Sequence, residues 1–172
     1  MSGPRRAPSR LARLSHVAVG TFLTSRPGTS RHLAAHRATR GRFLHTVAGL
    51  RVVILTTTGR RSGRRIDVPL VALADDDAWV VVASNGGRDD PPNWLRNLEA
   101  DPRATLRVGA HAHEVVARIA RPEERHRLWP RIVSRYGGYE TYRRRTARDV
   151  PLVLLEPAPQ DATGPAQRTD AG

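Results

Sequence analysis

The stretch 56–65, TTTGRRSGRR, holds the residues whose types and spacing best suit ligand chemistry. It places four arginines and two glycines directly after the apolar run 52–55. That order predicts a strand that ends in a tight basic turn. Glycine accepts positive φ without steric cost, so the turn can direct backbone N–H groups and guanidinium groups outward together. We expect the turn to bind an anion, with a solvated hairpin corner as the alternative.

Two nucleotide-binding motifs are excluded at this turn. It lacks the Lys-Ser/Thr ending of a phosphate-binding P-loop, and its glycines do not have the Gly-x-Gly-x-x-Gly spacing of a dinucleotide fingerprint. Any anion site here would therefore depend on the arginines and on the shape of the turn.

Other reactive residue types give weaker patterns. His111 and His113 lack a third metal ligand nearby, and the acidic run 75–77 reads as a turn, so we predict no metal site. Neither Ser62 nor Ser84 lies in a Gly-x-Ser-x-Gly elbow, which argues against a serine hydrolase.

Three tyrosines share one predicted helical face. Tyr136, Tyr139 and Tyr142 follow at i, i+3 and i+6 around a Gly-Gly pair. Aromatic side chains at this spacing either pack in a core or form the wall of a ligand site. Trp94 leaves a similar choice between a core plug and a stacking partner.

Short apolar runs separated by turn signals indicate the elements that must position these side chains. Runs such as 80–82 are apolar without alternation, which suggests that both faces of the sheet are covered and favours a barrel. The order of elements predicts a small antiparallel barrel with covering helices, of mainly β, α+β class. We expect strands over 50–57, 66–74, 78–84, 104–108, 114–120 and 151–156, and helices over 93–100, 122–136 and 139–146.

Charge divides the chain of 172 residues into unequal parts. Residues 1–48 hold nine arginines and no acid, a net charge of +9, whereas residues 49–172 hold twenty arginines and sixteen acids, a net charge of +4. We expect a basic arm over 1–48 that is partly disordered, a single domain over 49–157, and a disordered tail over 158–172.

The arm allows several interpretations. A modest amphipathic helix is expected from Ser9 onward, and it would pack on the domain or lie on an anionic membrane surface or a partner. A secretory signal would need a longer apolar stretch, while a transit peptide is allowed by composition. With no cysteine in the chain, a cytoplasmic location is the default, peripheral to the membrane if the arm binds lipid.

The number of arginines is weak evidence for nucleic-acid binding. All 29 basic residues are arginine, and together with many Ala, Gly and Pro residues this indicates GC-rich codon usage. The chain contains no nucleic-acid recognition motif, and we predict no nucleic-acid partner.

Six short motifs occur in an order that resembles the deazaflavin-dependent nitroreductase family. They are TTTGRRSG at 56–63, ASNGG at 83–87, PNWLRNL at 92–98, WP at 129–130, YxxYxxY at 136–142 and VPLVLLEP at 150–157. The resemblance implies a split β-barrel similar to the FMN-binding flavin reductases. It also implies reduced coenzyme F420 as cofactor, a quinone as acceptor, and nitroaromatic reduction as a side activity.

The same resemblance assigns residues to the site. Tyr139 and Ser84 are candidate catalytic donors, and Tyr136 and Tyr142 would frame the acceptor. The implied coenzyme-binding residues are Arg60, Arg61, Ser62, Ile66, Asp67, Val68, Pro69, Leu70, Val71, Val82, Ala83, Ser84, Asn85, Asn93, Trp94, Leu95, Arg96, Asn97 and Tyr139.

Departures from the family pattern leave rival functions open. The pattern has Lys where this chain has Arg61 and Asn85, and Met where it has Asn93. The change at Asn85 removes a positive charge and puts tail affinity or acceptor preference in doubt. An FMN-dependent oxidoreductase and a non-catalytic coenzyme or lipid carrier are the alternatives.

Overall fold

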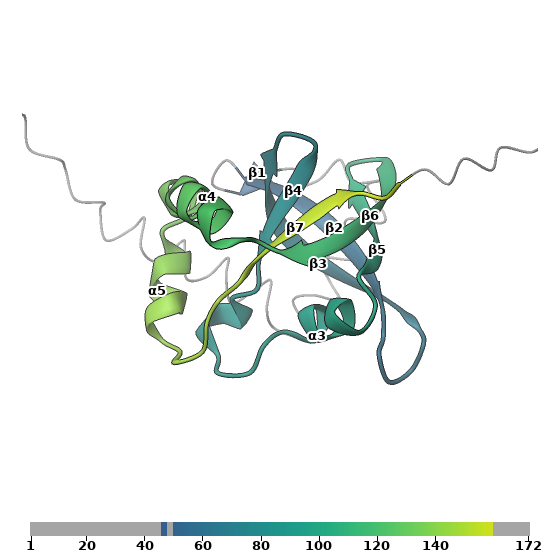
Figure 1. Ribbon diagram of the computed structural model, residues 1–172, viewed down its shortest axis with the longest axis horizontal. Helices are drawn as coiled ribbons and strands as arrows, with labels where there is room; N and C mark the ends of the chain where they lie inside the picture. The colour runs from purple at the N-terminus through teal and green to yellow at the C-terminus, as the bar shows by residue number, and fades with distance from the viewer. Residues whose placement is uncertain (1–45, 48–49, 160–172) are drawn as a thin grey trace, which may run out of the picture.

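The computed structural model describes residues 46, 47 and 50–159 of the chain (Figure 1). The basic arm up to residue 45 and the tail from residue 160 lie outside the described residues. The elements are β1 (Thr46–Val47), β2 (Leu50–Thr58), β3 (Arg65–Asp75), β4 (Ala78–Val82), η1 (Asn85–Gly87), α3 (Asn93–Ala100), β5 (Arg103–Val108), β6 (His111–Ile119), α4 (Pro122–Arg135), α5 (Gly138–Arg144) and β7 (Leu152–Pro157).

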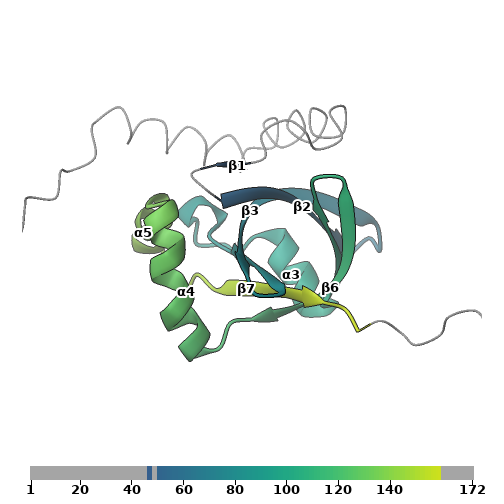
Figure 2. The ribbon, with the colours of Figure 1, turned by 90° about the horizontal axis from the view of Figure 1, so that it is seen from above.

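Six of the strands close into an antiparallel barrel. The sheet runs in the order β1-β2-β3-β4-β7-β6-β5, and a further pairing of β2 with β5 joins its two sides. Leu55 of β2 lies opposite Val68 of β3 on one side and Leu106 of β5 on the other. Viewed end-on in Figure 2, the strands form a ring, and β1 lies outside it at the side of β2. The predicted barrel is confirmed.

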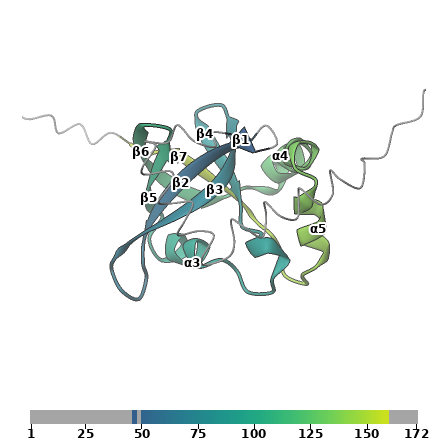
Figure 3. The same ribbon diagram turned by 180° about the vertical axis from the view of Figure 1, so that it is seen from behind.

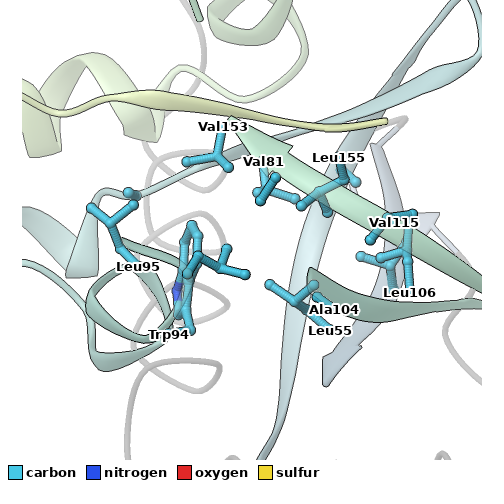
Figure 4. Packing of buried hydrophobic residues seen from close by; sticks show 14 residues of the cluster. Leu55, Val81, Trp94, Leu95, Ala104, Leu106, Val115, Val153 and Leu155 are labelled. Atoms are coloured by element: carbon cyan, nitrogen blue, oxygen red, sulfur yellow. The ribbon is translucent and has the colours of Figure 1, made fainter. Parts of the chain in front are cut away.

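The barrel interior is filled by side chains from each of the six barrel strands. Leu55, Val81, Leu106 and Leu155 belong to one buried cluster, and each is fully enclosed. Trp94 enters this cluster from α3, and Figure 4 shows its ring directed toward the strand side chains. In this structure Trp94 therefore plugs one opening of the barrel.

A second buried cluster covers the outside of the barrel. Val80 and Val82 of β4 pack there with Leu128 and Ile132 of α4 and with tyrosines of α5. The successive valines of β4 alternate between the two clusters, since Val81 points inward. Both faces of β4 are thus covered, as the unbroken apolar run predicted.

Several predicted boundaries shift. β6 begins at His111 rather than at residue 114, because His111 and Ala112 already pair with Val108 and Arg107 across a short turn at 109–110. His111 and His113 are therefore strand residues.

β4 ends at Val82 rather than at residue 84. The N–H of Ala83 bonds the carbonyl of Pro151 at 3.0 Å, and Ser84 has helical φ and ψ. The predicted strand residues 83–84 instead lead into the η1 turn.

A buried carboxylate joins the barrel to α4. Asp75, at the end of β3, accepts two hydrogen bonds from the Arg127 guanidinium at 2.8 and 2.7 Å and one from Arg131 at 2.5 Å. These bonds, Arg127 first, lower the pKa of the Asp75 carboxyl to about 2, although burial opposes the shift. The two arginines thus tie α4 to the end of β3.

We predict that Asp75→Asn lowers the free energy of unfolding near neutral pH by about 1–2 kcal/mol, a discounted figure because the two arginines are half exposed. The carboxyl has a lower pKa folded than unfolded, so its contribution is present above about pH 4 and is lost as the pH falls toward 2. Urea unfolding at about pH 7 and about pH 3 should show that the difference in unfolding free energy between wild type and variant is smaller at the lower pH. Asp77→Asn, in the exposed turn, is the control, and an unchanged difference would contradict the assignment.

Candidate active site

The basic turn between β2 and β3 is a compact loop that projects beyond the barrel beside α3 (Figure 3). The N–H of Gly59 bonds the carbonyl of Arg64 at 2.8 Å, and the N–H groups of Ser62 and Gly63 bond the carbonyl of Gly59 at 3.0 and 2.8 Å. Gly63 takes φ of +64°, as the glycine-rich sequence predicted. The loop is thus held by its own backbone, while its arginines are exposed.

α3 fixes the turn through one buried amide. Asn97, 3% exposed, accepts bonds from the Arg60 N–H at 3.2 Å and from the Arg60 guanidinium at 3.3 Å. Its NH₂ group donates to the Thr57 hydroxyl at 3.1 Å. The amide of Asn97 thus orients Arg60 and ties the basic turn to α3.

The segment after β4 is built from residues with positive φ. Asn85 has φ of +47°, Gly86 of +66° and Gly87 of +81°. A side chain at position 87 would lie 2.9 Å from the backbone oxygen of Tyr142. Glycine at this position therefore allows η1 to pack directly on α5.

The three tyrosines form one aromatic cluster. The ring of Tyr139 meets Tyr136 edge-on at 5.1 Å and Tyr142 at 6.2 Å, and the hydroxyls of Tyr136 and Tyr142 lie 3.1 Å apart. Burial raises the pKa of Tyr136 and of Tyr139 above the ordinary tyrosine value. Both hydroxyls therefore stay protonated and able to donate at physiological pH.

Two buried hydroxyls have no partner within residues 50–159. Ser84 is 7% exposed and Tyr139 is 6% exposed, and neither hydroxyl makes a hydrogen bond there. Buried hydroxyls are normally satisfied, because leaving one unpaired costs about 1–3 kcal/mol. Within the described residues, the hydroxyls of Ser84 and Tyr139 are therefore unsatisfied.

Strand alternation separates the other predicted residues. On β3, Val68 and Leu70 pack against the barrel interior whereas Val71 packs against the outer cluster, and the Thr56 hydroxyl donates to Asp67 at 2.8 Å. The interior cluster also holds Ala83, Trp94 and Leu95, and the outer cluster holds Val82. Among the remaining predicted residues, Pro69 is buried, Arg96 is partly buried, and Ile66, Asn93, Arg61 and Ser62 are exposed.

Sequence reasoning missed Arg148. Its guanidinium donates to the carbonyls of Ala83 and Ser84 at 3.0 and 2.8 Å and to that of Arg88 at 3.0 Å. The only available signal was its place two residues before the final predicted motif. Nothing in the chain's local pattern linked it to a loop some 60 residues away.

Other candidate sites fall elsewhere or are not formed. A surface cavity lined by Trp79, Arg103, His113 and Glu114 holds none of the predicted residues. Within the described part of the chain, no three His, Asp or Glu residues are grouped to hold a metal ion. No helix found there is long and apolar enough to cross a membrane.

The closed six-stranded barrel with covering helices has the split-barrel architecture that the sequence predicted. Residues 29–157 match the F420H(2)-dependent quinone reductase family, and the chain belongs to that family. Reduced coenzyme F420 is therefore its cofactor. The match starts at residue 29, whereas we expected the domain to span residues 49–157.

Relatives support this identification. An F420H(2)-dependent quinone reductase of Mycobacterium tuberculosis is 35% identical over 129 residues, which is 72% of this chain and 86% of the relative. A solved F420-H2 dependent reductase is 33% identical with a TM-score of 0.56, covering 61% of this chain and 93% of that one. A second solved structure, described as a domain-swapped dimer, is 28% identical with a TM-score of 0.58, covering 74% and 96%.

We predict that Asn97→Ala destabilises the fold by about 1–3 kcal/mol, because it leaves Thr57 and the Arg60 N–H without their partner. The same variant should weaken F420 binding, since Arg60 loses its fixed orientation. Thermal unfolding and a coenzyme titration measure the two effects. Glu99→Ala, exposed on the same helix, is the control for stability. Equal melting temperatures for the two variants would contradict this role.

Proposed function

We propose that this chain binds reduced F420 between the basic turn, the η1 segment and the tyrosine cluster, and reduces a quinone there. The observation that carries the proposal is the pair of buried, unpaired hydroxyls of Ser84 and Tyr139. They belong to segments that pack together, because Gly87 of η1 approaches Tyr142 of α5 closely.

The basic turn suits the anionic end of the coenzyme. F420 carries a phosphodiester and a polyglutamate tail, and Arg60, Arg61 and Arg64 present positive charge in a loop with a fixed backbone. Guanidinium groups form paired, charge-assisted hydrogen bonds to phosphate and carboxylate. Arg65 is tied down, since its guanidinium donates to the Thr105 hydroxyl, which in turn donates to Glu114.

In this proposal the residues of the site bind the coenzyme, orient it and donate hydrogen bonds. Reduced F420 supplies the hydride when bound. The tyrosine rings shield the site from water, and a hydroxyl of Ser84 or Tyr139 can donate to the oxygen that gains negative charge on the acceptor. Because burial raises the pKa of Tyr139, this donor keeps its proton across the physiological range.

The finer expectations from sequence belong to the same proposal. We retain nitroaromatic reduction as a side activity, because a site that places a hydride donor beside a flat acceptor does not require a quinone. Contact of the basic arm with an anionic membrane surface, and hence a peripheral location, concern residues 1–48 and rest on their charge and modest amphipathic pattern. A cytoplasmic location rests on the absence of cysteine from the chain.

A parallel titration with F420 and FMN separates the proposal from its rivals. We expect tight binding of F420 and weak binding of FMN, together with oxidation of reduced F420 by menadione. Tight FMN binding without F420 binding would favour the FMN oxidoreductase, and F420 binding without turnover would favour a carrier.

We predict that Arg61→Ala weakens F420 binding by about tenfold to a hundredfold and makes the remaining binding less dependent on salt. The reason is the loss of one charge-assisted contact to the anionic tail. Fluorescence titration at low and high salt measures both effects. Arg51→Ala, exposed at the far end of the same strand, is the control. If neither Arg60→Ala nor Arg61→Ala changes the affinity for F420, the turn is a solvated hairpin corner and not an anion site.

We predict that Tyr139→Phe lowers turnover on a quinone by about ten- to a thousandfold with little change in coenzyme affinity, because the lost bond forms in the transition state. Tyr139→Ala should in addition weaken coenzyme binding, since the ring wall is removed. Single-turnover kinetics and titration on both variants distinguish the two effects. If neither variant changes either quantity, Tyr139 is a core residue only, and Ser84→Ala becomes the test of the remaining donor.

A further inference from the structure

Arg148 connects two distant parts of the chain through backbone carbonyls. Its guanidinium meets the carbonyls of Ala83, Ser84 and Arg88, and also that of Asp149 at 2.9 Å. Among residues 50–159, no carboxylate forms an ion pair with it. The partly buried guanidinium of Arg148 therefore donates mainly to carbonyls of the 83–88 loop. These bonds hold that loop in one conformation.

The direction of these bonds determines where the opposite sides of the peptides face. No peptide bond in the described residues is cis, and in a trans peptide the C=O and the following N–H point in opposite directions. Arg148 draws the carbonyls of Ala83 and Ser84 toward itself. The N–H groups of Ser84 and Asn85 are therefore turned away from it.

Those two N–H groups are available. Within the described part of the chain, neither has a hydrogen-bond acceptor, although Gly87 donates to the Ser84 carbonyl at 2.9 Å. With the unpaired Ser84 hydroxyl, they make a set of adjacent donors at the end of β4. The Arg148 charge behind them strengthens them as donors to a negatively charged oxygen.

A second contact supports the same loop. The Thr146 hydroxyl donates to Asp89 at 2.9 Å and accepts the Arg148 N–H at 3.3 Å. The segment 146–151 thus holds residues 83–89 at both ends, since Ala83 also bonds Pro151. The loop keeps its positive φ values at Asn85, Gly86 and Gly87 within this frame.

We propose that Arg148 is a positioning residue for the F420 site, which holds the 83–88 loop so that the N–H groups of Ser84 and Asn85 and the Ser84 hydroxyl face the bound coenzyme. This inference rests on the proposed function. Arg148 acts through the loop and does not itself contact the coenzyme.

The test uses the full chain with Arg148→Ala and Arg148→Lys, each titrated with F420 and assayed with reduced F420 and menadione. Both variants should bind F420 at least about tenfold more weakly, because a lysine ammonium cannot span carbonyls that a planar fork meets together. Guanidinium ion at low millimolar, non-denaturing concentration should restore binding by Arg148→Ala, and sodium chloride at equal concentration should not.

Arg125→Ala is the matched control. Arg125 donates to the Val150 carbonyl at 2.7 Å, in the same segment, and makes no bond to the 83–88 loop. It should lower the melting temperature while leaving F420 affinity within about twofold. If Arg148→Ala does not fold, Arg148→Lys decides by the same criterion.

Three results would overturn the inference. If the wild-type protein binds F420 and the Arg148 variants bind it with equal affinity, the inference is wrong and the proposed function stands. Weakened binding that guanidinium does not restore, or that Arg125→Ala reproduces, assigns Arg148 a general structural role. Wild type that fails to bind F420 refutes the proposed function and the inference with it.

Discussion

The pairing of β2 with both β3 and β5 is the constraint on which the structure depends. It closes the sheet, so that β2 has a hydrogen-bonded neighbour on each side over the stretch 54–57. Closure removes the exposed strand edges that would otherwise invite association. It also fixes where β2 must leave the barrel, and hence where the basic turn that follows it stands.

A closed barrel of this size has no room for a large coenzyme inside. The interior is filled by strand side chains and by Trp94. Polar side chains tether the connections outside the ring. Asn97 holds the basic turn, Arg148 holds the loop after β4, and Arg127 and Arg131 hold α4 through Asp75.

The tyrosine cluster rests on α5, which the outer core positions against β4. The unpaired hydroxyls of Ser84 and Tyr139 are costly to the free protein and useful to a complex. Unsatisfied polar groups of this kind are expected at functional sites.

The sequence by itself determined the succession of strands and short helices along the chain, favoured a barrel and indicated the family, because apolar periodicity and turn chemistry are local and the six motifs keep their order. Only the tertiary structure decided which side of β3 faces the interior. It also decided that Asn97 bonds Arg60 of the basic turn and that Arg148 bonds the carbonyls of Ala83 and Ser84. These are contacts between residues 37 to 65 positions apart. Strand register and barrel closure bring these residues together, and neither can be read from a local sequence pattern.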